Sequence, residues 1–133
     1  SKLYYCRAES KMKLFDYRGA IKDYQFAISV HSNERPMPRL LTLYNSIGRA
    51  RLLLEDNQNA LIDLYKGIKL SKDETITFQD GEETSDQELG ESYYLIGNAK
   101  FKINNIEGAC KAWSKSGELG YADAYNAIKD NCK

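Results

Sequence analysis

The side chains that could do acid–base or covalent chemistry are few and lie far apart in this sequence. There is one histidine, His31, and there are three cysteines, Cys6, Cys110 and Cys132. An imidazole can activate a thiolate, but none of these cysteines lies in a local catalytic signature. The sequence also contains no phosphate-binding loop and no GxGxxG, HExxH or GxSxG pattern. We therefore predict no catalytic residue and a protein that is not an enzyme.

Metal and cofactor chemistry finds equally little support. The three cysteines do not form the close pairs of a zinc site. The longest acidic stretch, an insertion at 73–89 and the residues next to it, lacks the alternating Asp/Asn spacing of a calcium loop. We predict no metal and no cofactor, and we interpret the insertion as a solvated loop or, alternatively, as a loop that docks on a basic surface. Its eight acids, with no Lys or Arg among them, are Asp73, Glu74, Asp80, Glu82, Glu83, Asp86, Glu88 and Glu91.

The charge balance and the lengths of the apolar stretches argue against nucleic acid and membrane as partners. The 133 residues carry 19 Lys and Arg against 19 Asp and Glu, so no overall basic field recruits nucleic acid. No apolar stretch is long enough to cross a membrane. Three acids, Asp16, Asp23 and Asp63, are spaced like charges on the surface of helices.

A pattern of small and bulky residues occurs three times and organises the chain. Each copy follows a polar turn and has a small residue, a bulky one four positions later and a small one three positions after that. Residues with this spacing share one face of a helix. Since repeats decide the fold, this pattern is the main structural signal. The three sets are Ala20/Tyr24/Ala27, Ala60/Leu64/Gly67 and Ala109/Trp113/Ser116.

A second helix precedes each copy. Twelve residues before the first small residue lies another small one, Ala8, Gly48 or Gly97, with an aromatic residue four positions earlier. Glycine inside a helix costs about 1 kcal/mol against alanine, and close packing of two helices is the expected compensation. Each unit is therefore predicted to be a pair of helices of about 14 residues. Neither helix of a pair can bury its apolar face alone, so the pairs are expected to stack.

These spacings resemble the tetratricopeptide repeat (TPR), whose unit is about 34 residues. The resemblance covers units at about 1–34, 41–74 and 90–123 and implies an all-α, right-handed α-solenoid superhelix of three repeats in one domain. Units spaced by 40 and 49 residues imply insertions, and the first one holds Pro36 and Pro38 in a predicted elbow. The departures from the family pattern are Ala8 and Arg7 in the first unit and, where a Tyr is expected, Lys11, Arg51 and Lys100.

The tail is predicted to form a capping helix at about 121–131, with Ala122, Tyr125 and Ile128 on its apolar face. Residues 108–120 resemble the closing segment of bacterial TPR and Sel1-like proteins, which implies a bacterial source. Reflecting Cys110 through the turn near Gly120 brings it within about one helical turn of Cys132. Two reduced thiols are the simpler expectation, and a disulfide is the alternative. A disulfide would favour an extracytoplasmic compartment, and reduced thiols leave the cytoplasm open.

In the TPR family, the first helix of each unit lines a concave groove that binds a peptide. The resemblance therefore implies a non-catalytic module for an unidentified protein or peptide partner. The alternatives are an accessory or regulatory domain of a larger enzyme and a self-assembly scaffold. One TPR subclass clamps the acidic tail of chaperones, but its key places here hold Tyr5, Glu9, Ser46, Glu91 and Leu95, so we predict no such binding. The partner-binding candidates carried over by position are Tyr5, Glu9, Asn45, Arg49, Leu52, Tyr94, Asn98 and Lys102.

Overall fold

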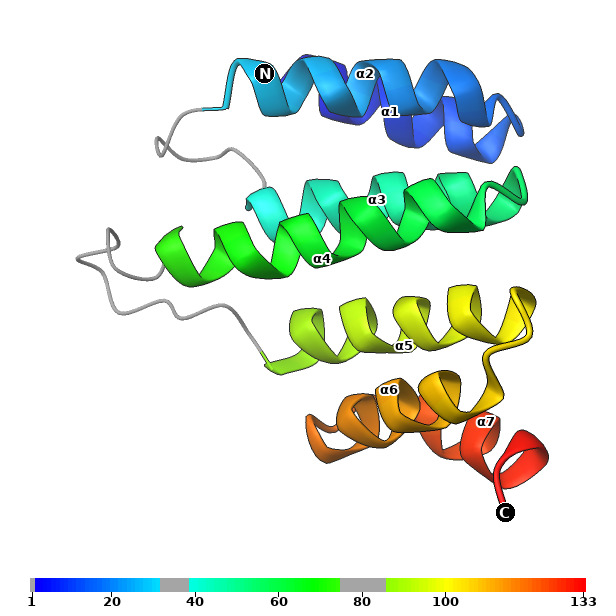
Figure 1. Ribbon diagram of the computed structural model, residues 1–133. Helices are drawn as coiled ribbons and strands as arrows, with labels where there is room; N and C mark the ends of the chain where they lie inside the picture. The colour runs from blue at the N-terminus through cyan, green and yellow to red at the C-terminus, as the bar shows by residue number, and fades with distance from the viewer. Residues whose placement is uncertain (1, 32–38, 75–85) are drawn as a thin grey trace.

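The computed structural model of the chain is all-helical over the residues that it describes, 2–31, 39–74 and 86–133. Figure 1 shows the helices stacked in antiparallel pairs, with the turns inside the pairs at one end of the stack. The helices are α1 (Lys2–Lys13), α2 (Tyr17–Ser29), α3 (Leu40–Leu53), α4 (Asn57–Glu74), α5 (Asp86–Lys102), α6 (Ile106–Glu118) and α7 (Asp123–Asn131).

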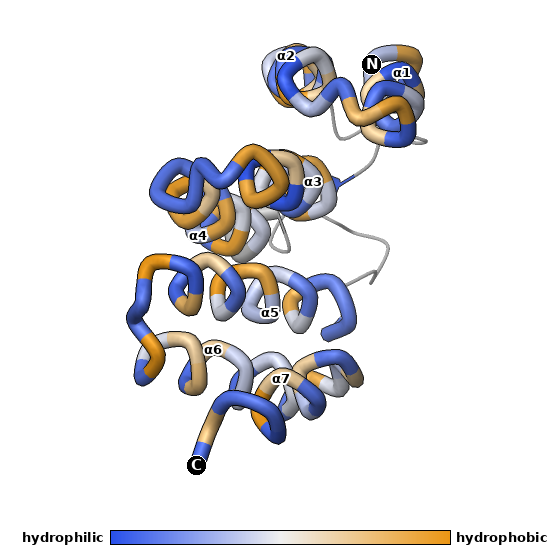
Figure 2. Tube along the Cα trace, turned by 90° about the vertical axis from the view of Figure 1, so that its right-hand side faces the viewer, coloured by the Kyte–Doolittle hydropathy of each residue, from blue (hydrophilic) through white to orange (hydrophobic). Residues whose placement is uncertain are grey.

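The helices form two layers. One layer holds α1, α3, α5 and α7, and the other holds α2, α4 and α6. In Figure 2, α2 and α4 lie beside α1 and α3, and α5 lies above α6 and α7. Each helix packs on its neighbours in the chain, and α3 also contacts α5 within its own layer. The predicted helix pairs are therefore present, and α7 takes the place that the first helix of a fourth pair would have.

The turn inside each pair has the same backbone in all three units. Phe15, Glu55 and Asn104 adopt positive φ angles of 64°, 60° and 68°. In each case the next residue, an Asp or Asn, donates its backbone N–H to a carbonyl five residues earlier, at 2.8 Å. In two units that Asp or Asn also caps the second helix with its side chain, as Asp16 does by accepting from the Gly19 N–H at 3.0 Å. Three identical turns explain why the pairs repeat so regularly.

Close helix packing follows from the repeated small residues. The nine residues of the three sets are all buried. A Cβ atom at Gly48 would lie 2.5 Å from Leu64, and one at Gly97 would lie 2.4 Å from the Trp113 indole. The two glycines therefore let the bulky residue of the second helix sit directly against the backbone of the first. This contact is the expected compensation for glycine inside a helix.

One expectation about charged residues is wrong. Asp23 is not a surface charge but is 4% exposed, and it accepts two hydrogen bonds from the Arg7 guanidinium, at 2.7 and 2.8 Å. The Lys11 ammonium lies 3.0 Å from the same carboxylate. These contacts hold the pKa of Asp23 at about 2, chiefly through the hydrogen bonds from Arg7. The second unit repeats this pairing, since the Arg51 Nε donates to Asp63 at 2.6 Å.

Two of the departures from the TPR pattern thus have a physical reason. Lys11 and Arg51, at the place of the expected Tyr, each bind an aspartate of the partner helix. The third residue at this place, Lys100, has no such aspartate opposite it, because the equivalent position is Ala112. Its ammonium lies 5.6 Å from the centre of the Tyr65 ring, which belongs to the preceding pair.

The apolar face predicted for the last helix is also wrong in part. The residue that α7 buries fully is Ala124, and Ala127 and Ile128 pack beside it. Tyr125 is 59% exposed, and its hydroxyl donates to the Gly117 carbonyl at 2.8 Å. The buried face of α7 is therefore rotated about the helix axis relative to the predicted one. The prediction relied on a single set of three residues.

The structure joins Cys110 of α6 to Cys132 by a disulfide, with the two Cα atoms 5.9 Å apart. Of the two alternatives that the sequence left open, the structure contains the bond. The third cysteine, Cys6, is an exposed free thiol. Both prolines of the predicted elbow and residues 75–85 of the acidic insertion lie outside the described residues.

Candidate functional site

Three adjoining hollows follow the layer formed by α1, α3, α5 and α7. The first, of about 190 Å³, lies between α1, α3 and α5. The second, of about 300 Å³, lies between α3 and α5 and shares Arg49 with the first. The third, of about 340 Å³, lies between α5 and α7 and shares Asn98 and Phe101 with the second. We call this continuous depression the inner groove.

The structure brings together all eight residues that the sequence singled out. Tyr5, Glu9, Asn45 and Arg49 line the first hollow. The second is lined by Arg49, Leu52, Asn98 and Lys102, and the third by Tyr94 and Asn98. The first helix of each pair therefore contributes side chains to these hollows.

Arg49 occupies the centre of the inner groove. Its guanidinium forms an ion pair with Glu91, and its side chain is 44% exposed. Burial raises the pKa values of Tyr5 and Tyr121, and the positive charge of Arg49 partly offsets this rise. A ligand carboxylate near Arg49 would have to compete with Glu91.

The first hollow is largely committed to internal contacts. Asn45 is 2% exposed; its amide donates to the Glu88 carbonyl at 3.2 Å and accepts from the Ser92 hydroxyl at 2.7 Å. Glu9 accepts a hydrogen bond of 2.5 Å from the Tyr24 hydroxyl. That contact, together with burial, raises the pKa of Tyr24 well above its usual range. Asn45 therefore joins α3 to α5, and it has little capacity left for a ligand.

The second hollow has the surface that a partner could bind. Leu53 is 52% exposed and Phe101 is 38% exposed, although both are apolar, and both line this hollow. Buried Leu52 and Leu95 form its floor, and Arg49 and Lys102 supply positive charge at its edge. An apolar floor with a charged rim suits a peptide side chain better than it suits bulk water.

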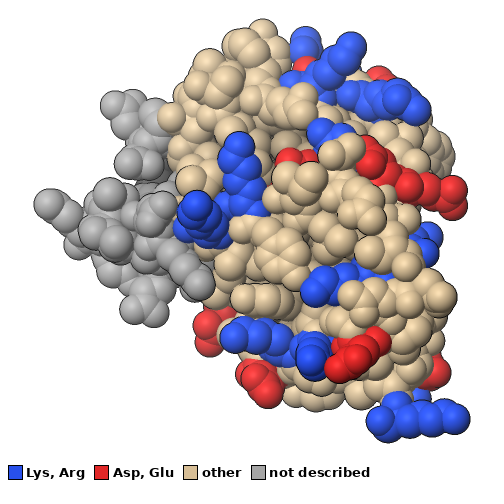
Figure 3. Space-filling model, in the orientation of Figure 1, with Lys and Arg blue, Asp and Glu red and all other residues tan. Residues whose placement is uncertain are grey.

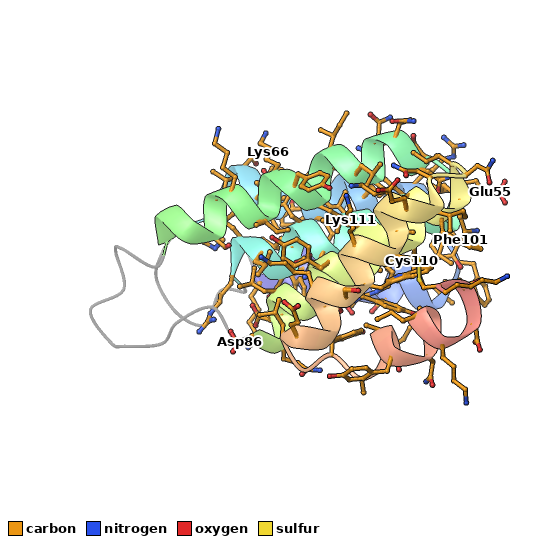
Figure 4. All side chains as sticks on the ribbon, turned by 60° about the horizontal axis from the view of Figure 1, so that its bottom comes forward. Glu55, Lys66, Asp86, Phe101, Cys110 and Lys111 are labelled. Atoms are coloured by element: carbon orange, nitrogen blue, oxygen red, sulfur yellow. A yellow bond between two sulfur atoms is a disulfide. The ribbon has the colours of Figure 1, made fainter. Side chains whose placement is uncertain are left out.

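The third hollow contains residues that the sequence analysis missed. They belong to α7, which was interpreted only as a cap. Their place in the sequence could have identified them. Helix α7 follows the second helix of a pair, α6, just as α3 follows α2, so α7 is expected to line the groove as the first helix of a pair does. Figure 4 places Phe101 at the end of the molecule where the pairs turn, away from Asp86. The missed groove residues of α7 are Asp123, Asn126, Ala127, Asp130 and Asn131.

Trp113 also lines this hollow, and Tyr121 contacts Tyr94, another of its lining residues. The Trp113 indole is 2% exposed, and its Nε1–H donates to the Asn98 amide oxygen at 3.2 Å. The ring of Tyr121 lies 5.2 Å from that of Tyr94. Asn98 thus has its oxygen engaged, while its amide N–H groups have no partner among the described residues. The polar edge of this hollow can still donate hydrogen bonds.

The described residues contain no grouping of three or more His, Cys, Asp or Glu side chains that could hold a metal ion. No described helix combines the length and the apolar character needed to cross a membrane. The opposite layer, formed by α2, α4 and α6, shows Lys and Arg interspersed with Asp and Glu (Figure 3). The inner groove is the candidate functional surface because it gathers exposed apolar side chains and amide donors that have no partner within the described part of the chain.

No protein-family model and no curated protein matches the sequence. Solved structures do match, among them the one described as "TPR2AB-domain:pHSP90-complex of yeast Sti1". It superposes with a TM-score of 0.81 and 16% sequence identity, over 98% of this chain and 45% of that chain. This chain thus spans less than half the length of that one. At an identity of 16%, the superposition shows a likeness of fold alone. The chain has a TPR-like helical-repeat fold.

Proposed function

We propose that this chain is a non-catalytic interaction module that binds a peptide or protein segment in its inner groove. The observation that carries the proposal is the second hollow, where Leu53 and Phe101 remain exposed beside Arg49 and Lys102. Exposed apolar side chains gathered in a depression with a polar rim are characteristic of binding sites. The resemblance of residues 108–120 to bacterial TPR and Sel1-like proteins supports a bacterial source for this module.

The partner is proposed to differ from an acidic chaperone tail. The solved neighbour is a complex with pHSP90, which is a property of that protein. In this chain, Ser46 and Leu95 are buried, and Glu91 neutralises Arg49. Glu9 adds a second carboxylate to the first hollow. With Arg49 already paired to Glu91, and with Glu9 in the same hollow, the lining residues at this end of the groove offer an acidic tail no unpaired cation, so we propose a partner segment with an apolar anchor.

The test is a matched pair of double variants. Leu53→Glu/Lys102→Glu places two acids in the second hollow, while Ile62→Glu/Lys69→Glu makes the same chemical change on exposed positions of α4. Both variants are compared with the unmodified chain by circular dichroism and thermal unfolding, so that only folded proteins are tested. Each is then used to retain proteins from an extract of the source organism.

A protein that the unmodified chain and the α4 variant retain, and that the groove variant loses, supports the proposal. Direct titration of that protein with the chain should then give saturable binding that the groove variant weakens by tenfold or more. Equal retention by all three proteins would assign binding to another surface. Association of the unmodified chain with itself, lost only in the groove variant, would favour a self-assembly scaffold instead.

A further inference from the structure

The α7 end of the inner groove differs in charge from its centre. The second hollow is lined by Lys102 and by Arg49, whose charge Glu91 balances, but the third hollow has two carboxylates, Asp123 and Asp130, and no Lys or Arg among its lining residues. The two aspartates are seven positions apart on α7, so both lie on the same face of that helix. The groove thus changes sign along its length.

Neither aspartate has a counter-ion in the part of the chain that the structure describes. Asp123 has a structural reason for its position, because an acid in the first turn of a helix interacts favourably with the free N–H groups there. Asp130 has no such reason. It lies in the last turn, where the free carbonyl groups disfavour a negative charge.

The other wall of the third hollow is aromatic. Phe101 is 38% exposed, and its ring lies 5.7 Å from that of buried Trp113. Half-buried Tyr94 completes the wall, and Asn98 and Asn126 add amide groups. The volume of about 340 Å³ exceeds the share of about ten water molecules in the liquid, so a long side chain can enter.

From these contacts we infer that the third hollow is a subsite for a Lys or Arg side chain of the bound segment; this inference rests on the proposed function. Carboxylates on one wall attract a cation, and aromatic faces on the other bind it through their quadrupoles. Arginine fits better than lysine, because its planar guanidinium can stack on an aromatic ring while it donates to a carboxylate and to an amide oxygen. The bound segment then has its basic residue toward α7 and its apolar anchor toward Leu53.

The test uses a displayed library of random peptides, selected on the full chain, on the Asp130→Asn variant and on a Glu118→Gln control. Glu118 is exposed and lies on α6, outside the inner groove, so the control removes the same charge elsewhere. Asp130 lies where a negative charge disfavours the helix, so its replacement should leave folding intact. Each selected peptide is checked for loss of binding to the Leu53→Glu/Lys102→Glu variant.

Peptides that depend on the groove are expected to share a Lys or Arg at a fixed distance from an apolar residue. Replacing that basic residue by Gln should weaken binding about fivefold to tenfold. The Asp130→Asn variant should bind the original peptide more weakly by a similar factor, and replacing the basic residue of the peptide by Gln should weaken binding to this variant little further. The Glu118→Gln variant should bind the peptide like the unmodified chain. An Asp130→Lys variant should select peptides without the basic residue.

The outcomes separate this inference from the proposed function. Groove-dependent peptides without a shared basic residue, or binding that is unchanged in Asp130→Asn, would overturn the inference and leave the proposed function standing. Peptides that bind the Leu53→Glu/Lys102→Glu variant as well as the unmodified chain would overturn both.

Discussion

The close approach of α5 and α6 at Gly97 gives a sharp prediction about stability. A Cβ atom at this position would lie 2.4 Å from both Cδ1 and Nε1 of the Trp113 indole. The indole is 2% exposed, donates to Asn98 and packs on Phe101, so it cannot move freely. Gly97→Ala should therefore lower the free energy of unfolding, even though alanine favours helix.

The magnitude follows from three contributions. Overpacking a rigid buried ring costs about 2 kcal/mol. Displacement of the indole weakens its hydrogen bond to Asn98, a loss of about 1 kcal/mol. Alanine in place of glycine inside a helix returns about 1 kcal/mol. The net expectation for Gly97→Ala is a loss of about 2 kcal/mol in the free energy of unfolding.

Gly117 is the matched control, because it also lies in a helix near an aromatic ring. A Cβ atom there would meet the Tyr125 ring at 3.2 Å; that side chain is 59% exposed, and its hydrogen bond to the Gly117 carbonyl leaves room for a small adjustment of the ring. Gly117→Ala should change the free energy of unfolding by at most about 0.5 kcal/mol, because the helix preference for alanine offsets a small adjustment of Tyr125.

Urea denaturation provides the assay, with two signals. Circular dichroism follows all helices, and the fluorescence of Trp113, the one tryptophan of the chain, follows the contact itself. Gly97→Ala should lower the urea midpoint by both signals and change the Trp113 emission of the folded protein. If Gly97→Ala were as stable as the unmodified chain or more stable, close packing could not be the reason for this glycine.

Three further expectations concern single contacts. Asp23→Asn should lower the free energy of unfolding at pH 7 by about 1–2 kcal/mol, after allowance for the exposed partner Arg7, and should have no such effect at pH 2. Since the pKa of Asp23 falls to about 2 on folding, the contribution of its carboxylate to stability is full above about pH 5 and disappears as the pH falls toward 2. Acid titrations monitored by circular dichroism measure this loss. Asn45→Ala should cost about 1–3 kcal/mol in urea denaturation, because it leaves the buried Ser92 hydroxyl without one partner, and an unchanged midpoint would contradict the account of Asn45 as a structural link. Reduction of the Cys110–Cys132 bond, which spans 22 positions, should destabilise α7 by up to about 3 kcal/mol, because the unfolded chain regains conformational entropy. Amide hydrogen exchange should then become faster in α7 and not in α1. Equal exchange in the oxidised and the reduced protein would show that packing alone holds α7.

The sequence by itself determined the helix pairs and their close contacts. Both depend on residues a few positions apart, whose relation is set by the 3.6-residue period of the helix. Burial could be predicted for the repeated sets because the pattern occurs three times in the chain. All members of two of these sets, Ala20/Tyr24/Ala27 and Ala109/Trp113/Ser116, are buried. The list of groove residues came instead from the resemblance to the TPR family, carried over by position.

The contacts of individual polar residues were decided only by the tertiary structure. Asp23 had the spacing of a surface charge, but its burial depends on two basic side chains 12 and 16 positions away. Asn45 had the position of a groove residue, but its amide is bound to α5, more than 40 positions along the chain. A short spacing pattern cannot specify such pairings, because they depend on how one helix is rotated and shifted against another.

The same reason applies to α7. Its nine residues form a helix with no repeated copy, so the sequence could not fix which face packs on α6. The structure buries Ala124 and turns Asp123 and Asp130 into the groove, while Cys132 meets Cys110 on the other side. The repeats thus set where the groove lies, and the rotation of a single unrepeated helix set the charge at its end.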